Sequence, residues 1–175
     1  QPIAVVSDPQ VLNTLPRREF RSGLYEIIKY GMIADQKLFE RVRTNLSEIF
    51  DRSPKVLEQI IARSCRIKAD VVEKDEQEHG LRRILNFGHT AGHAIEAATN
   101  YRRFRHGEAI AYGMLVVSNI AVKRGIFSEN DRASLTEVIE SLGPLPSVRD
   151  LSAKMLLAIM KRDKKVSKGH LHVVL

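Results

Sequence analysis

Apolar side chains recur at intervals of three or four residues along most of the chain, which is the spacing of amphipathic helices. Leu38, Val42, Leu46 and Ile49 form one such stripe, which we expect to end near Asp51. Further helical patterns cover 24–32, 54–71, 90–98, 110–124, 128–142 and 151–165. These patterns predict a mainly α fold with roughly six to eight helices.

Residues that favour helix ends stand at three of the expected boundaries. Ser53 followed by Pro54 is typical of an N-terminal cap with a proline in the first turn. Gly125 follows the apolar segment 110–124 and favours a C-terminal cap there. Ser128 favours a cap at the start of the next helix. The boundaries that these residues mark agree with those that the apolar spacing predicts.

Three segments depart from helical spacing. The run IAVVSD at 3–8 predicts a short buried strand or an extended lead-in to the first helix. The run GHLHVVL at 169–175 alternates as a strand does. Gly80 interrupts the helical pattern and predicts a small hairpin or a turn near 77–86. We therefore expect short extended segments at the termini of an otherwise helical domain.

Composition narrows the classes of protein to which the chain can belong. Its 175 residues, 43% apolar and 28% charged, suffice for one domain with a core or for a large piece of a longer protein. The sequence has no run of about 20 apolar residues, so no membrane span is expected, and no secretory leader is expected either. A single cysteine, Cys65, excludes an internal disulfide and fits the reducing cytoplasm.

The net charge of +7 permits nucleic-acid binding, but its distribution argues against that role. Basic residues are scattered among acids, and the four Tyr and six Phe form no array for stacking bases. A phosphorylated or carboxylated small molecule explains the positive excess equally well. Gln1 at the start and the apolar final segment suggest that the chain is an excised piece of a longer protein.

Three of the six histidines lie close together in the sequence, at His89, His93 and His106. His89 and His93 are four residues apart, so on a helix they share a face and can point into one cavity. Imidazole is a preferred ligand of zinc, and catalytic zinc sites commonly combine three protein ligands with an open position. The alternative is that these histidines form hydrogen bonds within a pair of closely packed helices.

Two further features favour a polar pocket between helices. Small residues surround the histidines and let helices approach closely: Gly88, Ala91, Gly92, Ala94, Ala97, Gly107, Ala109 and Ala111. Charged residues also occupy positions in apolar stripes, namely Glu26, Lys29 and Lys68. Any one of them can extend past the apolar rim to water. The three together with the histidines are better explained by a pocket that binds a ligand.

Four blocks of the sequence resemble 3-dehydroquinate synthases, in the order found in that family: 17–35, 67–96, 104–114 and 163–175. The central motif GLRRILNFGHTAGHAIE and the downstream HGEA are the most specific. The resemblance implies that 1–175 is a single helical metal- and substrate-binding domain, the C-terminal domain of that fold. It also implies that the N-terminal NAD-binding domain is absent from this chain, so we expect the chain alone to be inactive.

The resemblance further implies a divalent metal, normally Zn²⁺ with Co²⁺ as the other candidate, and NAD in the full-length enzyme. Its metal ligands would be Glu26, His89 and His106, and the catalytic residues would be Lys29 and His93. The residues that would bind an anionic sugar phosphate are Lys68, Arg82, Asn86, and Lys164 or Lys165. Family members act in the shikimate pathway as phosphate-releasing lyases and are typically homodimers, which we expect of the full-length protein.

Three other interpretations compete with this one. A related cyclase acting on sedoheptulose 7-phosphate or glucose 6-phosphate would share the metal ligands and differ in its substrate contacts. An iron-dependent polyol dehydrogenase with a similar helical domain would lack the motif GLRRILNFGHT and the cluster of anion-binding residues. A non-catalytic helical module would bind no metal.

Overall fold

The structure is a computed structural model that describes residues 3–78, 80–162, 166–167, 170–171 and 173–175. Within these ranges the α-helices are α1 (Arg17–Ala34), α2 (Gln36–Thr44), α3 (Leu46–Phe50), α4 (Pro54–Lys74), α5 (His89–Ala98), α6 (His106–Lys123), α7 (Glu129–Ser141) and α8 (Ala153–Arg162). Two 3₁₀ helices, η1 (Pro9–Thr14) and η2 (Leu81–Asn86), and two short antiparallel strands, β1 (Val166–Ser167) and β2 (His170–Leu171), complete the described elements. The predicted mainly α fold is confirmed.

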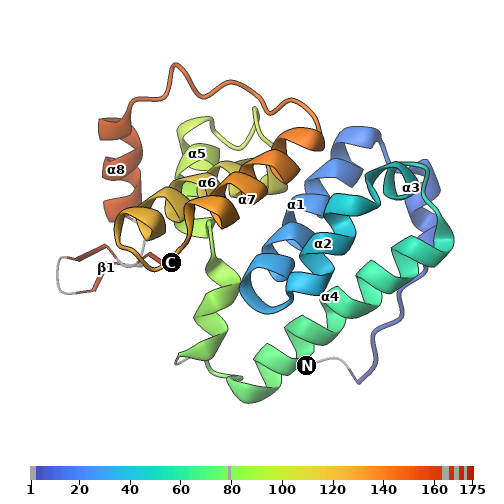
Figure 1. Cartoon of the computed structure of the whole chain (residues 1–175). Coiled ribbons are helices and arrows are strands. Elements are labelled where there is room, and N and C mark those ends of the chain that lie inside the picture. Colours follow the sequence, from blue (N-terminus) through green and yellow to red (C-terminus); the bar gives the residue numbers. More distant parts are fainter. Residues whose placement is uncertain (1–2, 79, 163–165, 168–169, 172) are drawn as a thin grey trace.

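The helices form two groups that meet along α1 and α6. Figure 1 shows α1 to α4 on one side of the molecule and α5 to α8 on the other, with the segment that contains η2 running between them. α1 packs against α2 and α4 in its own group and against α6 of the other. α6 in turn packs against α5 and α7. A residue on α1 that faces α6 therefore lies at the seam between the two groups.

One apolar core extends across this seam. Leu24 and Ile28 of α1 are buried together with Ile110 and Met114 of α6. Val42, Ile60, Leu135 and Ile139 extend the same cluster into α2, α4 and α7. A smaller cluster holds α8 against α5 and α6 through Ile95 and Phe104, with Leu156 beside them. The core fixes α1, α5 and α6 relative to one another, and these are the helices that carry the histidine motif and Glu26.

The predicted caps agree with the structure. Ser53 is the N-cap of α4 and Pro54 its first residue, although the Ser53 side chain makes no capping hydrogen bond. Gly125 follows α6 with φ of +70°, the left-handed conformation that glycine adopts most readily. The Ser128 hydroxyl accepts a hydrogen bond from the Asp131 N–H at 3.0 Å, which satisfies one free donor of the first turn of α7.

One local prediction was wrong, and two others hold in only one of their two alternatives. The stripe from Leu38 to Ile49 is not one helix, because the chain breaks at Asn45 between α2 and α3. The described residues of 77–86 form no hairpin, and of the two alternatives the turn holds, at Glu76 and Gln77 ahead of η2. Of the two alternatives for 3–8 the lead-in holds and the buried strand does not, since the run precedes η1 in no regular element and Ile3, Val5 and Val6 are 106%, 76% and 93% exposed.

The C-terminal prediction is confirmed only in part, because β2 falls within the expected strand and the described residues 173–175 lie in no regular element.

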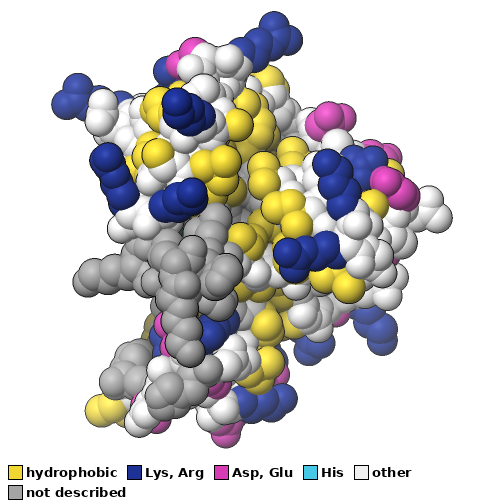
Figure 2. Space-filling view, turned by 90° about the vertical axis from the view of Figure 1, so that its left-hand side faces the viewer, with side chains coloured by type: hydrophobic (Ala, Val, Ile, Leu, Met, Phe, Trp, Pro, Cys, Tyr) yellow, Lys and Arg dark blue, Asp and Glu magenta, His cyan; other side chains and the backbone are white. Residues whose placement is uncertain are grey.

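The face that carries α8 is rich in apolar side chains. Figure 2 shows them as a band on this face, with Lys and Arg side chains around it. Met155 and Leu157 of α8 are 39% and 49% exposed. Exposed apolar surface of this kind is typical of a face that another protein surface covers. In the part of the chain that the structure describes, no helix has both the length and the apolar character needed to cross a membrane.

Candidate metal site

The start of α5 and the middle of α6 are in close backbone contact, and glycine makes this possible. A Cβ atom built on Gly113 of α6 would lie 1.8 Å from the carbonyl oxygen of Gly88, which immediately precedes α5. No other residue fits between the two backbones at this point. This contact brings the first turn of α5, with His89, close to α6, and it bears out the expectation that small residues around the histidines permit close packing.

The three imidazoles gather at the end of this helix pair. The ring centroid of His89 lies 5.4 Å from that of His93 and 5.4 Å from that of His106. One ring nitrogen can be chosen from each of the three so that all lie within 4.8 Å of one another. His89 and His93 share a face of α5, as their spacing predicted, and His106 reaches them from the first residue of α6.

Glu26 of α1 faces the same cluster from the opposite side of the seam. Its Oε1 lies 3.9 Å from Nε2 of His89 and 3.8 Å from Nε2 of His106. Oε1 is buried and has no hydrogen-bond partner, whereas Oε2 accepts a 2.7 Å hydrogen bond from the Lys29 ammonium. A buried carboxylate oxygen without a partner is costly. Its cost is removed if a cation binds at that oxygen.

Hydrogen bonds on the far side of two rings leave their Nε2 atoms available. Nδ1 of His89 lies 3.2 Å from the carbonyl oxygen of Phe87, which can only accept, so Nδ1 carries the proton. Nδ1 of His106 lies 3.3 Å from both carboxylate oxygens of Glu96. Outer partners of this kind fix the ring orientation and tautomer of metal-binding histidines.

The electrostatic surroundings keep His89 in the form that binds metals. Burial, together with the nearby Lys29 ammonium, lowers the pKa of His89 to about 4, against a smaller opposing effect of Glu26. The imidazole is therefore neutral near pH 7, with a lone pair on Nε2 directed toward Glu26.

The donor set of Glu26, His89 and His106 fits a divalent cation. Two ligand atoms on a tetrahedral zinc, each about 2.0–2.1 Å from the metal, stand about 3.4 Å apart. The observed separations of 3.8 and 3.9 Å between Glu26 Oε1 and the two nitrogens exceed this only slightly. Carboxylate oxygen and imidazole nitrogen are both common zinc ligands. His93 also lies within the cluster, so its role as a catalytic residue stays a prediction.

The predicted substrate-binding residues Lys68, Arg82 and Asn86 lie on α4 and η2. Lys68 is exposed on α4, because Ser64, Ile67 and Val71 are the residues that this part of the helix buries. Arg82 of η2 donates from Nη1 to the Glu76 carbonyl oxygen at 2.7 Å. α4 packs against η2, which places both residues in the same part of the fold.

Asn86, the last residue of η2, donates to Glu78 Oε1 at 3.0 Å. Lys164 and Lys165 lie outside the described residues.

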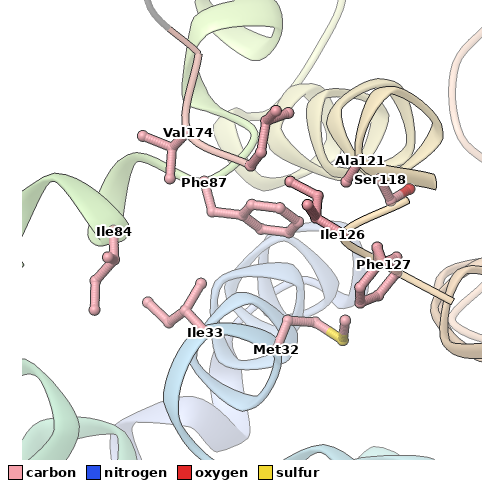
Figure 3. Close-up of a pocket in the computed structure, with 10 residues that line it drawn as sticks. Met32, Ile33, Ile84, Phe87, Ser118, Ala121, Ile126, Phe127 and Val174 are labelled. Carbon is pink, nitrogen blue, oxygen red and sulfur yellow. The ribbon is translucent and has the colours of Figure 1, made fainter. Parts of the chain in front are cut away.

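A separate pocket of about 230 Å³, lined in part by Phe87, does not suit an anion. Figure 3 shows Met32, Ile33 and Phe127 around it, with the Phe87 ring inside. Among the described residues that line it, Ser118 alone has a polar side chain. A sugar phosphate needs charged or hydrogen-bonding partners. The histidine cluster, with its charged neighbours, is therefore the better candidate for such a substrate.

Sequence reasoning missed two carboxylates near the cluster. Glu96 is 8% exposed and contacts His106, and Glu108 is fully buried and bonded to Arg18. Glu96 stands among small and apolar residues of a helix, which is the same signal that singled out Glu26. Glu108 gives the same signal, since Gly107, Ala109 and Ile110 surround it, but its partner on α1 is distant in sequence and only the fold brings the two together.

The fold and the site define a mainly helical domain with a candidate metal centre where α1, α5 and α6 meet. Residues 23–166 match the family model described as 3-dehydroquinate synthase C-terminal. The chain belongs to this family.

The 3-dehydroquinate synthases of Solibacter usitatus and Nostoc punctiforme are 46% and 45% identical over the whole chain. The chain spans about half the length of these curated relatives, 49% of each.

Two solved structures of related enzymes share the fold. One is a 2-epi-5-epi-valiolone synthase from Streptomyces hygroscopicus with NAD⁺ and Zn²⁺ bound. It superimposes with a TM-score of 0.84 at 28% identity, over 95% of this chain and 46% of that one. The other is a 2-deoxy-scyllo-inosose synthase complexed with carbaglucose-6-phosphate, NAD⁺ and Co²⁺. Its TM-score is 0.72 at 30% identity, over 87% of this chain and 42% of that one.

Proposed function

We propose that this chain is the metal- and substrate-binding half of a 3-dehydroquinate synthase. The full-length enzyme converts 3-deoxy-D-arabino-heptulosonate 7-phosphate into 3-dehydroquinate and phosphate, in the cytoplasm and as a homodimer. The observation that carries the proposal is the buried, unpartnered Oε1 of Glu26 opposite the Nε2 atoms of His89 and His106. Membership of the family and the length of the relatives support it.

Glu26, His89 and His106 would hold the divalent cation, which is Zn²⁺ or Co²⁺ in the two related solved structures. A cation at that position supplies Lewis acidity toward oxygen atoms of the substrate and so favours loss of a hydroxyl proton. NAD, held mainly by the half of the protein beyond this chain, supplies reversible hydride acceptance. The remaining tasks belong to side chains of this chain.

Lys29 and His93 are the proposed catalytic residues. The Lys29 ammonium is only 3% exposed and holds Oε2 of Glu26, so it stands beside the candidate cation with its charge in a region of low dielectric. A cation so placed favours a substrate oxygen that loses its proton. The His93 ring lies 5.9 Å from that of His106, and it can exchange a proton with the phosphate end of the substrate.

Lys68 and Arg82 are proposed to bind the substrate carboxylate, Asn86 to contact the substrate near its phosphate, and Lys164 or Lys165 to bind the phosphate itself. Arg82 and Asn86 are now bonded to Glu76 and Glu78 of the segment that follows α4. Each of these bonds uses one nitrogen, so Arg82 can bind an anionic group through its other guanidinium nitrogens, and Asn86 through its second amide N–H. Arginine suits the carboxylate because its planar guanidinium binds one through two parallel hydrogen bonds.

A second candidate is another sugar-phosphate cyclase, which the two related solved structures favour. The 46% identity to 3-dehydroquinate synthases, against 28% and 30% to those two enzymes, supports the first candidate. The test is turnover of the metal-loaded full-length protein with NAD and each sugar phosphate in turn. We expect phosphate release from 3-deoxy-D-arabino-heptulosonate 7-phosphate. Turnover of sedoheptulose 7-phosphate or glucose 6-phosphate alone would establish the second candidate instead.

A further inference from the structure

Three positions on α1 face three consecutive residues at the start of α6. Arg18, Ser22 and Glu26 are four residues apart, so they lie along one face of α1 at intervals of about one turn. Opposite them stand residues 106–108, the first turn of α6. The two sets pair in order, and each pair has its own kind of contact.

The first pair joins Arg18 to Glu108, whose side chain is completely buried. Nε of Arg18 donates to Oε1 at 2.8 Å and Nη2 donates to Oε2 at 2.7 Å, so the guanidinium binds both oxygens. The backbone N–H of Arg105 also donates to Oε2 of Glu108, at 2.9 Å. The carboxylate therefore caps the start of α6 and attaches it to α1 in one defined orientation.

The second pair joins Ser22 to Gly107. The Gly107 N–H donates to the Ser22 hydroxyl at 3.0 Å. A Cβ atom on Gly107 would lie 1.9 Å from the Ser22 carbonyl oxygen, so the two backbones touch. A shift of α6 along α1 in either direction would drive a side chain into this contact.

The third pair is Glu26 and His106, two of the candidate metal ligands, at 3.8 Å. We infer that the Arg18–Glu108 ion pair positions these ligands by fixing the register of α1 against α6. The inference rests on the proposed function, because it concerns the same metal site. Arg18 lies about 12 Å along α1 from Glu26, at roughly 1.5 Å per residue, so it touches neither the cation nor the substrate. It is a positioning residue.

Register explains this ion pair better than stability does. Only the Glu108 half of the pair is buried: the Arg18 side chain is 43% exposed, so water screens its attraction and the pair adds little to stability. Arg21 also lies 3.5 Å from Oε1 of Glu108, so the buried carboxylate keeps a cationic neighbour when Arg18 is replaced. The two-pronged contact of a guanidinium with a carboxylate has one favourable geometry, whereas apolar contacts tolerate sliding. If the pair only stabilised the fold, its two-pronged contact and its position two turns along α1 from Glu26 would have no further role.

The test measures the affinity of the full-length protein for Co²⁺ by competition with a chromophoric chelator. The variants are Arg18→Lys, Arg18→Gln, Glu108→Gln and the apolar double variant Arg18→Met with Glu108→Leu. Affinity is measured below the unfolding temperature of each variant, as determined by circular dichroism. Asp150→Asn, which breaks the exposed pair with Arg103, and Leu135→Ala, which truncates a buried residue of α7, are the controls.

We expect Arg18→Gln, Glu108→Gln and the double variant to bind Co²⁺ at least about 10-fold more weakly, as when outer partners of a metal site are lost. Arg18→Lys keeps the positive charge but lacks the planar guanidinium, so its affinity for Co²⁺ should be intermediate. Leu135→Ala should unfold at a lower temperature and bind Co²⁺ with wild-type affinity. Asp150→Asn should match the wild type in unfolding temperature and in Co²⁺ affinity. Unchanged affinity in the folded double variant or in Arg18→Gln would overturn the inference. Absence of Co²⁺ binding in the wild type would instead overturn the proposed function.

Discussion

Lys29 donates a 2.7 Å hydrogen bond to Oε2 of Glu26 and leaves Oε1 of the same carboxylate buried without a partner. The two residues are three apart on α1, so the helix itself sets their contact. The ammonium orients the carboxylate and partly offsets its charge. One oxygen is thereby held by the protein, and the other is directed toward the imidazoles of His89 and His106.

Replacing Lys29 should separate catalysis from metal binding. Lys29→Met keeps most of the apolar stem and removes the ammonium. We expect the variant to retain its cation within about 10-fold of the wild-type affinity, because loss of the hydrogen bond to Glu26 is offset by removal of a positive charge that repels the cation. Turnover should fall by at least about 100-fold, as when a group that assists proton transfer is lost. Metal content and kcat are measured on the same preparation of the full-length protein. A near-normal kcat would exclude a catalytic role for Lys29.

The Glu96 carboxylate should matter through the ring that it orients. Glu96→Ala removes the acceptor for Nδ1–H of His106, and we expect metal affinity to fall by about 10- to 100-fold. Glu96→Gln keeps an acceptor oxygen, so its metal affinity should fall less. Glu40→Gln, on the exposed surface of α2, is the matched control and should bind metal normally. Equal affinities for Glu96→Ala and Glu40→Gln, measured by isothermal titration calorimetry, would show that the ring needs no such partner.

Acid stability should depend in part on Asp35, which joins α1 to α2. Burial tends to raise its pKa, but hydrogen bonds from Arg63 and from the backbone N–H groups of Leu38 and Lys37 hold the pKa of Asp35 below its usual value. A lowered pKa stabilises the fold above the unfolded value of about 3.9. That contribution disappears as the pH falls through the lower, folded value.

The prediction uses Asp35→Asn, since asparagine also caps helices and the change removes mainly the charge. The variant should be less stable than the wild type in urea at pH 6, and the difference should shrink toward pH 3. In Asp35→Ala the free energy of unfolding should fall by about 1 kcal/mol more, because the helix cap is lost too. A difference between the wild type and Asp35→Asn that stays constant with pH would exclude this role for the carboxylate.

The chain alone should bind a cation without turning over substrate. Glu26, His89 and His106 all belong to it, whereas the proposed NAD site belongs mainly to the rest of the protein. We expect no NAD-dependent phosphate release from 3-deoxy-D-arabino-heptulosonate 7-phosphate by the 175-residue chain. The same assay on the full-length protein is the positive control. Clear turnover by the chain alone would show that this half contains a complete active site.

Periodicity predicted the helices well because most of them bury one face against the common core. It failed where a local backbone effect or a missing contact decides the structure. The apolar stripe of α2 continues through α3, yet the chain turns at Asn45. The β-branched run at 3–8 has the composition of a buried strand, but the described strands β1 and β2 pair with each other, and Val6 stays 93% exposed.

The site was only partly predictable from spacing. The interval between His89 and His93 placed both on one face of a helix, and the apolar surroundings of Glu26 and Lys29 indicated a polar pocket. Their convergence with His106 depends on the packing of α1, α5 and α6, which no local pattern encodes. The resemblance to a known family supplied that link. Lys68 seemed to lie in the apolar stripe of α4, but the buried face is turned by one residue, toward Ile67.

The most direct test of the metal site is the zinc content of the purified chain and of four variants. Each is dialysed against a buffer in which a chelator sets the free zinc concentration and zinc is in excess over the protein. The account predicts about one zinc per wild-type chain. The variants Glu26→Ala, His89→Ala and His106→Ala should retain almost none, and His93→Ala should retain zinc at the wild-type level. A wild-type chain that holds no zinc, or a Glu26→Ala variant that holds it undiminished, would contradict the central claim.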